Sequence, residues 1–134
     1  MQHGIDTEDE ARVAYEMATG QEVQQVGFCE LSEWIGASPD GLIGEDKGLE
    51  LKCPNSDTHL RYLCEGFGND YYYQVQGNIW CSGRLSWDVV SYDSRFPEDK
   101  QLLITTIYRD PEALEGLENR INLCIAKAKE IMKI

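Results

Sequence analysis

Charged side chains recur at a suggestive spacing in the first half of the sequence. Asp40 follows a proline, nine residues (41–49) separate it from Glu50, and Lys52 comes two residues later. Two carboxylates held close together repel each other, and neither is buried in its ionised form without compensation. A divalent cation supplies that compensation. Because the ligands are all oxygens, the expected ion is Mg²⁺, with Mn²⁺ as a substitute.

Such a site suits the hydrolysis of phosphodiester bonds, because a bound cation lowers the pKa of water and neutralises charge in the transition state. Lys52 beside the cation would orient the attacking water or stabilise the developing negative charge. The main-chain carbonyl of Leu51, between the two charged positions, is a further oxygen ligand. The tripeptide Glu50-Leu51-Lys52 is weak by itself, since an ordinary Glu–Lys pair on the surface of a strand has the same pattern.

Hydrophobic alternation and turn residues predict the elements that carry these side chains. Four strands are expected over residues 22–29, 34–37, 41–44 and 49–53, joined as an antiparallel meander. In the last strand the period of two places Glu50 and Lys52 on one face, and Leu49, Leu51 and Cys53 on the other. Asp40 lies at the turn before the third strand. The three charged groups should therefore meet at one edge of a sheet.

A capping box at Thr7 and Glu10 predicts a helix that runs to Thr19 and stops at Gly20. Its expected inward stripe also carries Glu8, which is therefore either a solvated acid of the first turn or a group directed at the site. The apolar members of that stripe are Ala11, Ala14, Tyr15 and Ala18.

The second half of the chain predicts two helices and two strands. A helix over residues 71–81 should be capped by Asn69 or Asp70 and end at Gly83. Strands are expected over residues 86–92 and 102–108, the second being apolar enough to be central. Asp110 and a proline then start a long helix whose apolar stripe should pack on the sheet. The expected fold class is α/β (α+β), with a mixed sheet flanked by helices.

Composition limits the class of protein. The 134 residues correspond to one domain, residues 1–134, and contain no apolar run of the ~20 residues that cross a bilayer. Residues 1–6 do not resemble a secretory signal, so we expect a cytoplasmic protein with no membrane partner. The five cysteines lack a C-x-x-C pair, which argues against disulfides and zinc and predicts small core residues.

The net charge of −12 excludes a general basic surface for nucleic acid. DNA would have to be bound at a local site. The acidic surplus is either a solubilising surface or partly a cluster of carboxylates that binds cations.

Three segments together resemble the lambda exonuclease/YqaJ-type viral recombinase branch of the PD-(D/E)xK nucleases: SPDGL at 38–42, LELKCP at 49–54 and YQVQ at 73–76. The resemblance implies a restriction-endonuclease-like core. It also implies that Asp40, Glu50 and the Leu51 carbonyl bind the metal and that Lys52 is the catalytic lysine.

Two further positions follow from the resemblance alone. Glu8 falls where the family places an additional helix carboxylate near a second metal. Gln74 falls in the family's glutamine motif, where it helps to order the site or contacts substrate, with Gln76 as the alternative counterpart. The tyrosines at 71–73 are interpreted as packing residues rather than as a surface for base stacking.

The activity that the resemblance implies is a Mg²⁺-dependent 5′→3′ exonuclease that acts on double-stranded DNA in phage-type recombination. A single-strand annealing protein and a ring-shaped homotrimer are the implied partners. The family's N-terminal helical region, with an arginine that holds the 5′-phosphate, is expected to be missing from residues 1–134, and the cysteine spacing excludes an iron–sulfur cluster. The alternatives are an endonuclease of restriction or repair type, and a catalytically silent module that binds DNA ends or protein.

Overall fold

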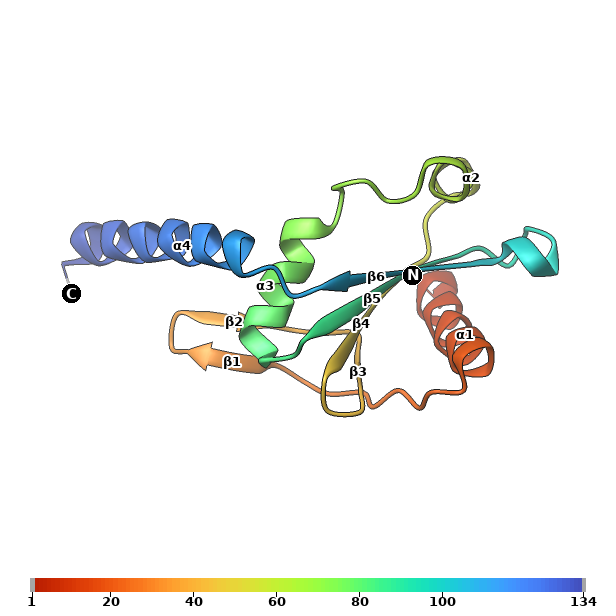
Figure 1. Cartoon of the computed structure of the whole chain (residues 1–134), viewed down its shortest axis with the longest axis horizontal. Coiled ribbons are helices and arrows are strands. Elements are labelled where there is room, and N and C mark those ends of the chain that lie inside the picture. Colours follow the sequence, from red (N-terminus) through yellow and green to blue (C-terminus); the bar gives the residue numbers. More distant parts are fainter. Residues whose placement is uncertain (1, 134) are drawn as a thin grey trace.

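The computed structural model describes the backbone of residues 2–133 and the side chains of residues 7–133. Two short strands and a four-stranded sheet are combined with helices, as Figure 1 shows. In chain order the elements are α1 (Gln2–Thr19), β1 (Cys29–Ser32), β2 (Ile35–Ala37), β3 (Gly41–Ile43), β4 (Lys47–Lys52), α2 (Ser56–Glu65), α3 (Tyr72–Ser82), β5 (Ser86–Tyr92), the 3-10 turn η1 (Glu98–Lys100), β6 (Leu102–Tyr108) and α4 (Pro111–Met132).

The main sheet has the strand order β3-β4-β5-β6. β4 and β5 are parallel, whereas β3 and β6 pair antiparallel with their neighbours. The sheet is therefore mixed and flanked by helices, which confirms the predicted fold class. β6 lies at the edge, so the prediction that residues 102–108 form a central strand was wrong.

β5 is central and buried along its whole length although its sequence alternates in polarity. Two of its polar side chains, Asp88 and Ser91, are buried with hydrogen-bond partners, whereas the buried indole N–H of Trp87 has none among the described residues. Asp88 accepts hydrogen bonds from the hydroxyls of Tyr15 and Thr106, and Ser91 is bonded to the ring of His59.

Helices cover both faces of the main sheet. Helix α1 packs Ala11 and Tyr15 against Leu49 and Leu51 of β4, and α2 and α3 cover the opposite face. The core on this second face consists of Leu42, Trp87 and Val89 of the sheet with Tyr62, Phe67, Val75 and Ile79 from the helices and the segment between them. Because side chains alternate along a strand, Glu50 is directed to the face that α3 covers.

The packing of β4 against β5 requires a glycine at position 48. A Cβ atom there would lie 2.1 Å from the ring of Trp87, which is fully buried. Gly48 thus lets the indole lie directly over β4, and it fixes the position of the strand that carries Glu50 and Lys52.

The N-terminal helix is longer than its capping box predicts. Thr7 and Glu10 lie inside α1 rather than at its start, while the predicted end at Thr19 and Gly20 is confirmed. Of the predicted inward stripe, Ala11 and Tyr15 are buried and Ala14 is partly buried, but Ala18 is exposed.

Helix α2 was not predicted. It begins after Asn55, whose side chain accepts a hydrogen bond from the amide of Thr58, a regular N-cap. The prediction for α3 was wrong at its start, because Tyr71 rather than Asn69 or Asp70 occupies the N-cap position. The predicted stop at Gly83 is confirmed by its left-handed conformation.

The predicted meander was also wrong in its first half. β1 and β2 form a separate two-stranded sheet that packs against α3; of residues 22–29 only Cys29 belongs to β1, and Gln24 forms a single bridge to Leu42. Three of the four residues of β1 are exposed. With no face to bury on the main sheet, this segment pairs locally instead.

Helix α4 begins as predicted, with the Asp110 side chain accepting a hydrogen bond from the amide of Ala113. It does not pack on the sheet, however. It contacts α3 and runs away from the sheet, and Leu114 is its buried residue (Figure 1). A stripe of apolar residues specifies which face of a helix is covered but not by what, and α1, α2 and α3 already cover both faces of the sheet.

Two expectations from composition can also be compared with the structure. None of the five cysteines, all of them described, is buried: Cys29 and Cys81 are half-buried, and Cys53, Cys64 and Cys124 are exposed. The prediction that most of them lie in the core was wrong. Among the described residues, no helix is long and apolar enough to cross a membrane.

Candidate active site

Glu50 lies at the centre of a small polar cluster on the face of β4 that α3 covers. Its side chain is only 8% exposed, and its Oε1 accepts hydrogen bonds from Lys52 Nζ at 2.8 Å and from Gln74 Nε2 at 3.3 Å. The ammonium of Lys52 also lies 4.8 Å from the ring centroid of Tyr71. The carboxylate and the lysine are therefore both held in place before any ligand binds.

Asp40 joins this cluster from the turn before β3. Its Oδ2 accepts a hydrogen bond of 2.7 Å from the amide of Leu51, which lies between Glu50 and Lys52. The amide and the carbonyl of one residue in a strand point to the same edge of that strand. The Leu51 carbonyl is therefore directed to the edge where Asp40 lies.

Burial and mutual repulsion make this cluster unfavourable for negative charge. Burial raises the pKa of Asp40, while the Leu51 amide and Lys52 oppose the shift. Burial also raises the pKa of Glu50; the hydrogen bond from Lys52 lowers it, and the charge of Asp40 raises it further. Two carboxyl groups with raised pKa values that repel each other are the arrangement that a divalent cation relieves.

Glu8, on α1, lies near the same cluster at an exposed position. Burial and the charge of Asp40 raise its pKa, whereas Arg12 and Lys52 lower it. The structure thus brings Glu8 within electrostatic range of Asp40 and Lys52. Within residues 7–133, however, no three His, Cys, Asp or Glu side chains gather closely enough to hold a metal ion by themselves. Main-chain oxygen, water or substrate would have to complete the ligands.

The two glutamines of α3 have different positions. Gln74 is exposed and bonded to Glu50. Gln76 is fully buried, donates from Nε2 to the carbonyl of Tyr108 at 2.8 Å, and accepts from the amide of Asp110 at 3.0 Å. Gln74 therefore belongs to the cluster, and Gln76 joins α3 to the end of β6 and the start of α4.

Sequence reasoning missed Tyr71, which it treated as a packing residue. The ring of Tyr71 does pack against Phe67, and its hydroxyl is bonded to Tyr62, but its face also contacts Lys52. A tyrosine directly before a helix that carries a site glutamine was the available signal. Tyr73, in contrast, is 62% exposed and has no part in the cluster.

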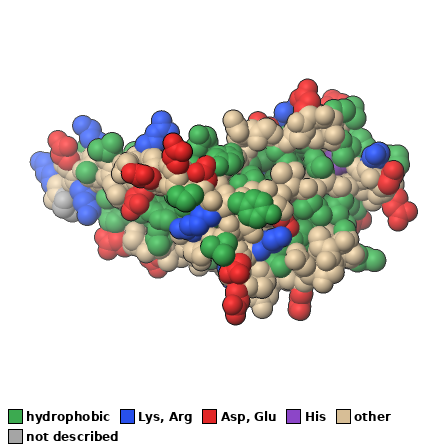
Figure 2. All heavy atoms as spheres, viewed as in Figure 1, with side chains coloured by type: hydrophobic (Ala, Val, Ile, Leu, Met, Phe, Trp, Pro, Cys, Tyr) green, Lys and Arg blue, Asp and Glu red, His purple; other side chains and the backbone are tan. Residues whose placement is uncertain are grey.

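Charge on the surface is mixed rather than basic. On the face drawn in Figure 2, acidic and basic side chains are interspersed, in agreement with the net charge of −12. The structure offers no broad cationic surface on that face, so an anionic substrate would have to be held at a local site.

The chain is similar to known exonucleases in both sequence and fold. The model of the YqaJ-like viral recombinase domain matches residues 1–85, and no curated protein matches the chain. An alkaline exonuclease (LHK-Exo) from Laribacter hongkongensis is similar over 99% of this chain and 70% of its own, with 36% identity and a TM-score of 0.92; its structure in complex with dAMP gives the same values. A phage related exonuclease from Haemophilus somnus 129PT is 16% identical over 98% of this chain and 71% of its own, with a TM-score of 0.78, which shows a shared fold alone.

These matches confirm the resemblance that the motifs around Asp40, Glu50 and Gln74 indicated. The family model covers more than half of the residues, and the Laribacter protein is similar over nearly all of them. The chain therefore belongs to the family of YqaJ-like viral recombinase domains.

Proposed function

We propose that the chain is a metal-dependent exonuclease that hydrolyses phosphodiester bonds at the ends of double-stranded DNA, in the 5′→3′ direction, during phage-type recombination. The family and the alkaline exonuclease to which the chain is similar support this activity. LHK-Exo was crystallised with dAMP. A deoxynucleoside monophosphate is the class of product that stepwise hydrolysis of a DNA strand releases.

The observation that carries the proposal is the cluster at the end of β4. Asp40 and Glu50 would hold a Mg²⁺ ion together with the Leu51 carbonyl, and their raised pKa values support this assignment. Hard divalent cations prefer such oxygen ligands, and Mn²⁺ would substitute. When bound, the cation neutralises charge on the phosphodiester as the bond breaks. Glu8, close to Asp40, would contact a second cation or its water.

Lys52 is the residue that we propose orients the attacking water and stabilises the developing negative charge. Its ammonium is held between Glu50 and Tyr71, so it presents a hydrogen bond in a fixed direction. There it would orient the attacking water and stabilise negative charge on the phosphate oxygens. Gln74 donates to Glu50 and thereby holds the carboxylate in the orientation that leaves its second oxygen for the cation.

A duplex substrate, a single-strand annealing protein and a ring-shaped homotrimer are the partners we propose with this activity. The chemistry of the cluster supports a phosphodiester substrate, and the exonucleases to which the chain is similar support DNA. The annealing protein and the trimer rest on the family resemblance, and sedimentation of the purified chain, alone and with an annealing protein, would test both.

One assay separates this proposal from its alternatives. Linear 5′-phosphorylated duplex and covalently closed circular duplex are incubated with Mg²⁺ and with chelator, and released nucleotides are measured. We expect release from the linear substrate alone, and only with Mg²⁺. Cutting of the closed circle would instead indicate an endonuclease, and no release from either substrate would indicate a silent binding module.

The chain offers a matched control for Lys52. Lys47, at the other end of β4, has the same side-chain exposure of 27% and also pairs with a buried carboxylate, Asp88, at 3.3 Å. Lys52→Ala should lower kcat by about 10²–10³-fold, the usual effect of removing one donor that stabilises charge in the transition state. Lys47→Ala removes a comparable ion pair and should leave kcat per folded molecule almost unchanged. Equal losses in the two variants would show that ion pairing, not chemistry, explains the effect.

A further inference from the structure

A small hollow of about 70 Å³ opens beside the candidate active site. Two of the residues that line it are adjacent in sequence to residues of the candidate site. Thr7 precedes Glu8, and Cys53 follows Lys52. The other lining residues are Pro54, Tyr92, Asp93, Ser94 and Arg95. They lie where β5 ends, next to the end of β4, because these two strands are parallel.

The electrostatics of Cys53 support this closeness to the cluster. Partial desolvation of the sulfur, together with the charges of Glu8, Asp40 and Asp93, raises the pKa of its thiol to about 11. The thiol thus lies within range of the site carboxylates on one side and of Asp93 on the other. The hollow therefore borders the cluster through Thr7 and Cys53, each of which is next to a site residue in the chain.

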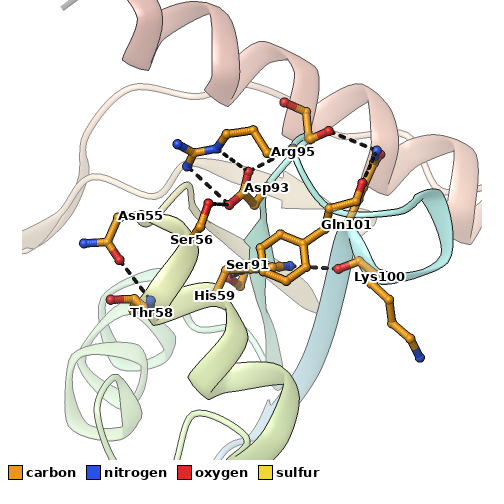
Figure 3. A network of polar contacts seen from close by, with 11 residues as sticks. Asn55, Ser56, Thr58, His59, Ser91, Asp93, Arg95, Lys100 and Gln101 are labelled. Atoms are coloured by element: carbon orange, nitrogen blue, oxygen red, sulfur yellow. Dashed lines mark hydrogen bonds and ion pairs between the residues drawn. The ribbon is translucent and has the colours of Figure 1, made fainter.

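Arg95 is the basic side chain among those that line the hollow, and it is held rigidly although it is 62% exposed. Its Nε donates to Asp93 Oδ1 at 2.8 Å and its Nη2 donates to Oδ2 at 3.2 Å (Figure 3). Within residues 7–133 its Nη1 has no acceptor. A guanidinium that is fixed on one side and has donors left on the other is suited to bind a phosphate.

The negative charge of Asp93 does not prevent Arg95 from binding a phosphate, because both carboxylate oxygens of Asp93 already accept hydrogen bonds. The carboxylate is 2% exposed and also accepts hydrogen bonds from the Ser56 hydroxyl at 2.7 Å and from the backbone amide of Arg95 at 3.0 Å. Burial alone would raise its pKa, but the hydrogen bonds from Arg95 and Ser56 lower the pKa of Asp93 to about 2. The aspartate stays ionised and points away from solvent, while the guanidinium faces it.

The loop that carries Arg95 is tied down at several points around Asp93. The ring of buried His59, on α2, is bonded to the Ser91 hydroxyl at 2.7 Å and to the Lys100 carbonyl at 2.9 Å (Figure 3). Gln101 donates to two further carbonyls of the loop, those of Ser94 and Phe96. The arginine is therefore presented by a rigid frame, which lowers the conformational entropy lost when a ligand binds.

We propose that Arg95 binds a phosphate of the DNA strand adjacent to the phosphodiester that is cut. The inference rests on the proposed nuclease function and adds to it a binding residue outside the metal cluster. On a chain with twice as many acidic as basic residues, one fixed guanidinium beside the carboxylates would determine where the strand lies.

The test compares Arg95→Gln with Arg61→Gln. Arg61 is a matched control because it is also exposed and paired with an aspartate, Asp70, at 3.3 Å, and does not line the hollow. With linear duplex and Mg²⁺, Arg95→Gln should raise KM about 10-fold with kcat within about three-fold, since a phosphate contact positions the strand but takes no part in the chemistry. Arg61→Gln should leave both constants unchanged.

Salt dependence gives a second readout that a purely structural role would not change. Binding of duplex is measured in the Lys52→Ala background, so that the substrate is not consumed. Loss of one phosphate contact should reduce the slope of log K against log salt by about 0.9. The chain with Arg95 should bind duplex more tightly than the Arg95→Gln variant. The ratio of the two affinities should fall about 3.5-fold when salt rises from about 50 to about 200 mM. An unchanged slope and KM, or the same changes in Arg61→Gln, would overturn the proposal.

Two further arms complete the experiment. If Arg95→Gln does not fold, Arg95→Lys keeps the charge but not the paired geometry, and should bind several-fold more weakly with the slope preserved; unchanged affinity would refute the contact. Duplexes with 5′-phosphate and 5′-hydroxyl ends distinguish a terminal phosphate from an internal one. A wild-type chain that neither binds nor cuts DNA would refute the proposed function itself, whereas a working nuclease with unaltered KM in Arg95→Gln refutes this inference alone.

Discussion

The two glutamines of α3 provide the sharpest test of the assignment of the site. Gln74 and Gln76 are two positions apart, and sequence alone leaves either as the functional residue. In the structure Gln74 donates to Glu50, whereas Gln76 is buried and bonded to backbone groups of Tyr108 and Asp110. Replacing each with leucine, which has a similar volume, should therefore affect different properties.

The expected magnitudes follow from these contacts. Gln76→Leu removes two hydrogen bonds and leaves a carbonyl and an amide without their partner, which costs about 2–4 kcal/mol in total. For a domain of this length the melting temperature falls by roughly 4 °C per kcal/mol, so the loss is about 8–16 °C. Gln74→Leu changes an exposed side chain and should change stability by less than about 0.5 kcal/mol. Its loss of the bond to Glu50 should reduce activity by about 10–100-fold, as for other residues that orient a metal ligand.

Thermal unfolding and nucleotide release from linear duplex, measured on both variants, decide the matter. Activity is compared well below the melting temperature, so that Gln76→Leu is folded and should cut DNA at nearly the wild-type rate. If Gln76→Leu were stable but inactive, or Gln74→Leu unstable but active, the division between the two roles would be wrong. Loss of both properties in both variants would show that α3 acts as a single unit.

Three other outcomes are expected. Gly48→Ala should lower the urea midpoint of unfolding, because a Cβ atom 2.1 Å from the buried Trp87 ring forces repacking that costs about 1–3 kcal/mol; an unchanged midpoint would contradict the packing. Mg²⁺ at about 100 times its Kd should raise the free energy of unfolding by about 2.7 kcal/mol, and Asp40→Asn should abolish most of the corresponding shift in melting temperature. In the presence of chelator, burial raises the pKa of Glu50 in the folded chain above its pKa in the unfolded chain. Protonation of Glu50 therefore adds to the free energy of unfolding; this contribution is complete below about pH 4 and is lost as the pH rises through the pKa of the folded chain. Glu50→Gln should flatten that fall in unfolding free energy with pH, and an identical pH profile would refute it.

Strand β4 could be predicted because the alternation of its residues specifies its local geometry. The alternation of Leu49, Glu50, Leu51 and Lys52 determines which side chains share a face, and the Glu50–Lys52 ion pair follows from it. Asp40 could be placed because a short hairpin returns β4 beside the start of β3. Local rules are sufficient for these contacts.

Elements whose positions depend on distant partners could not be predicted in the same way. Helix α2 has a regular cap at Asn55, but its apolar residues are few. It is held on the molecule by two of its own side chains, His59 and Tyr62, which are buried against the rest of the chain. The stripe of α4 predicts a covered face, and nothing local says that α3 rather than the sheet provides the cover. The cysteines illustrate the limit of composition, since small apolar side chains are tolerated at exposed positions such as Cys53.

The parallel pairing of β4 and β5 explains how distant segments reach one site. In a pure meander the two strands would end at opposite edges, and Arg95 would lie far from Lys52. Because α2 and α3 form a crossover between them, both strands end at the same edge, where ligands of mixed and parallel sheets usually bind. The same crossover carries Gln74 back over β4 to reach Glu50. The antiparallel hairpin of β3 and β4 therefore suffices to bring the carboxylates together, whereas the positions of Gln74 and Arg95 depend on the crossover.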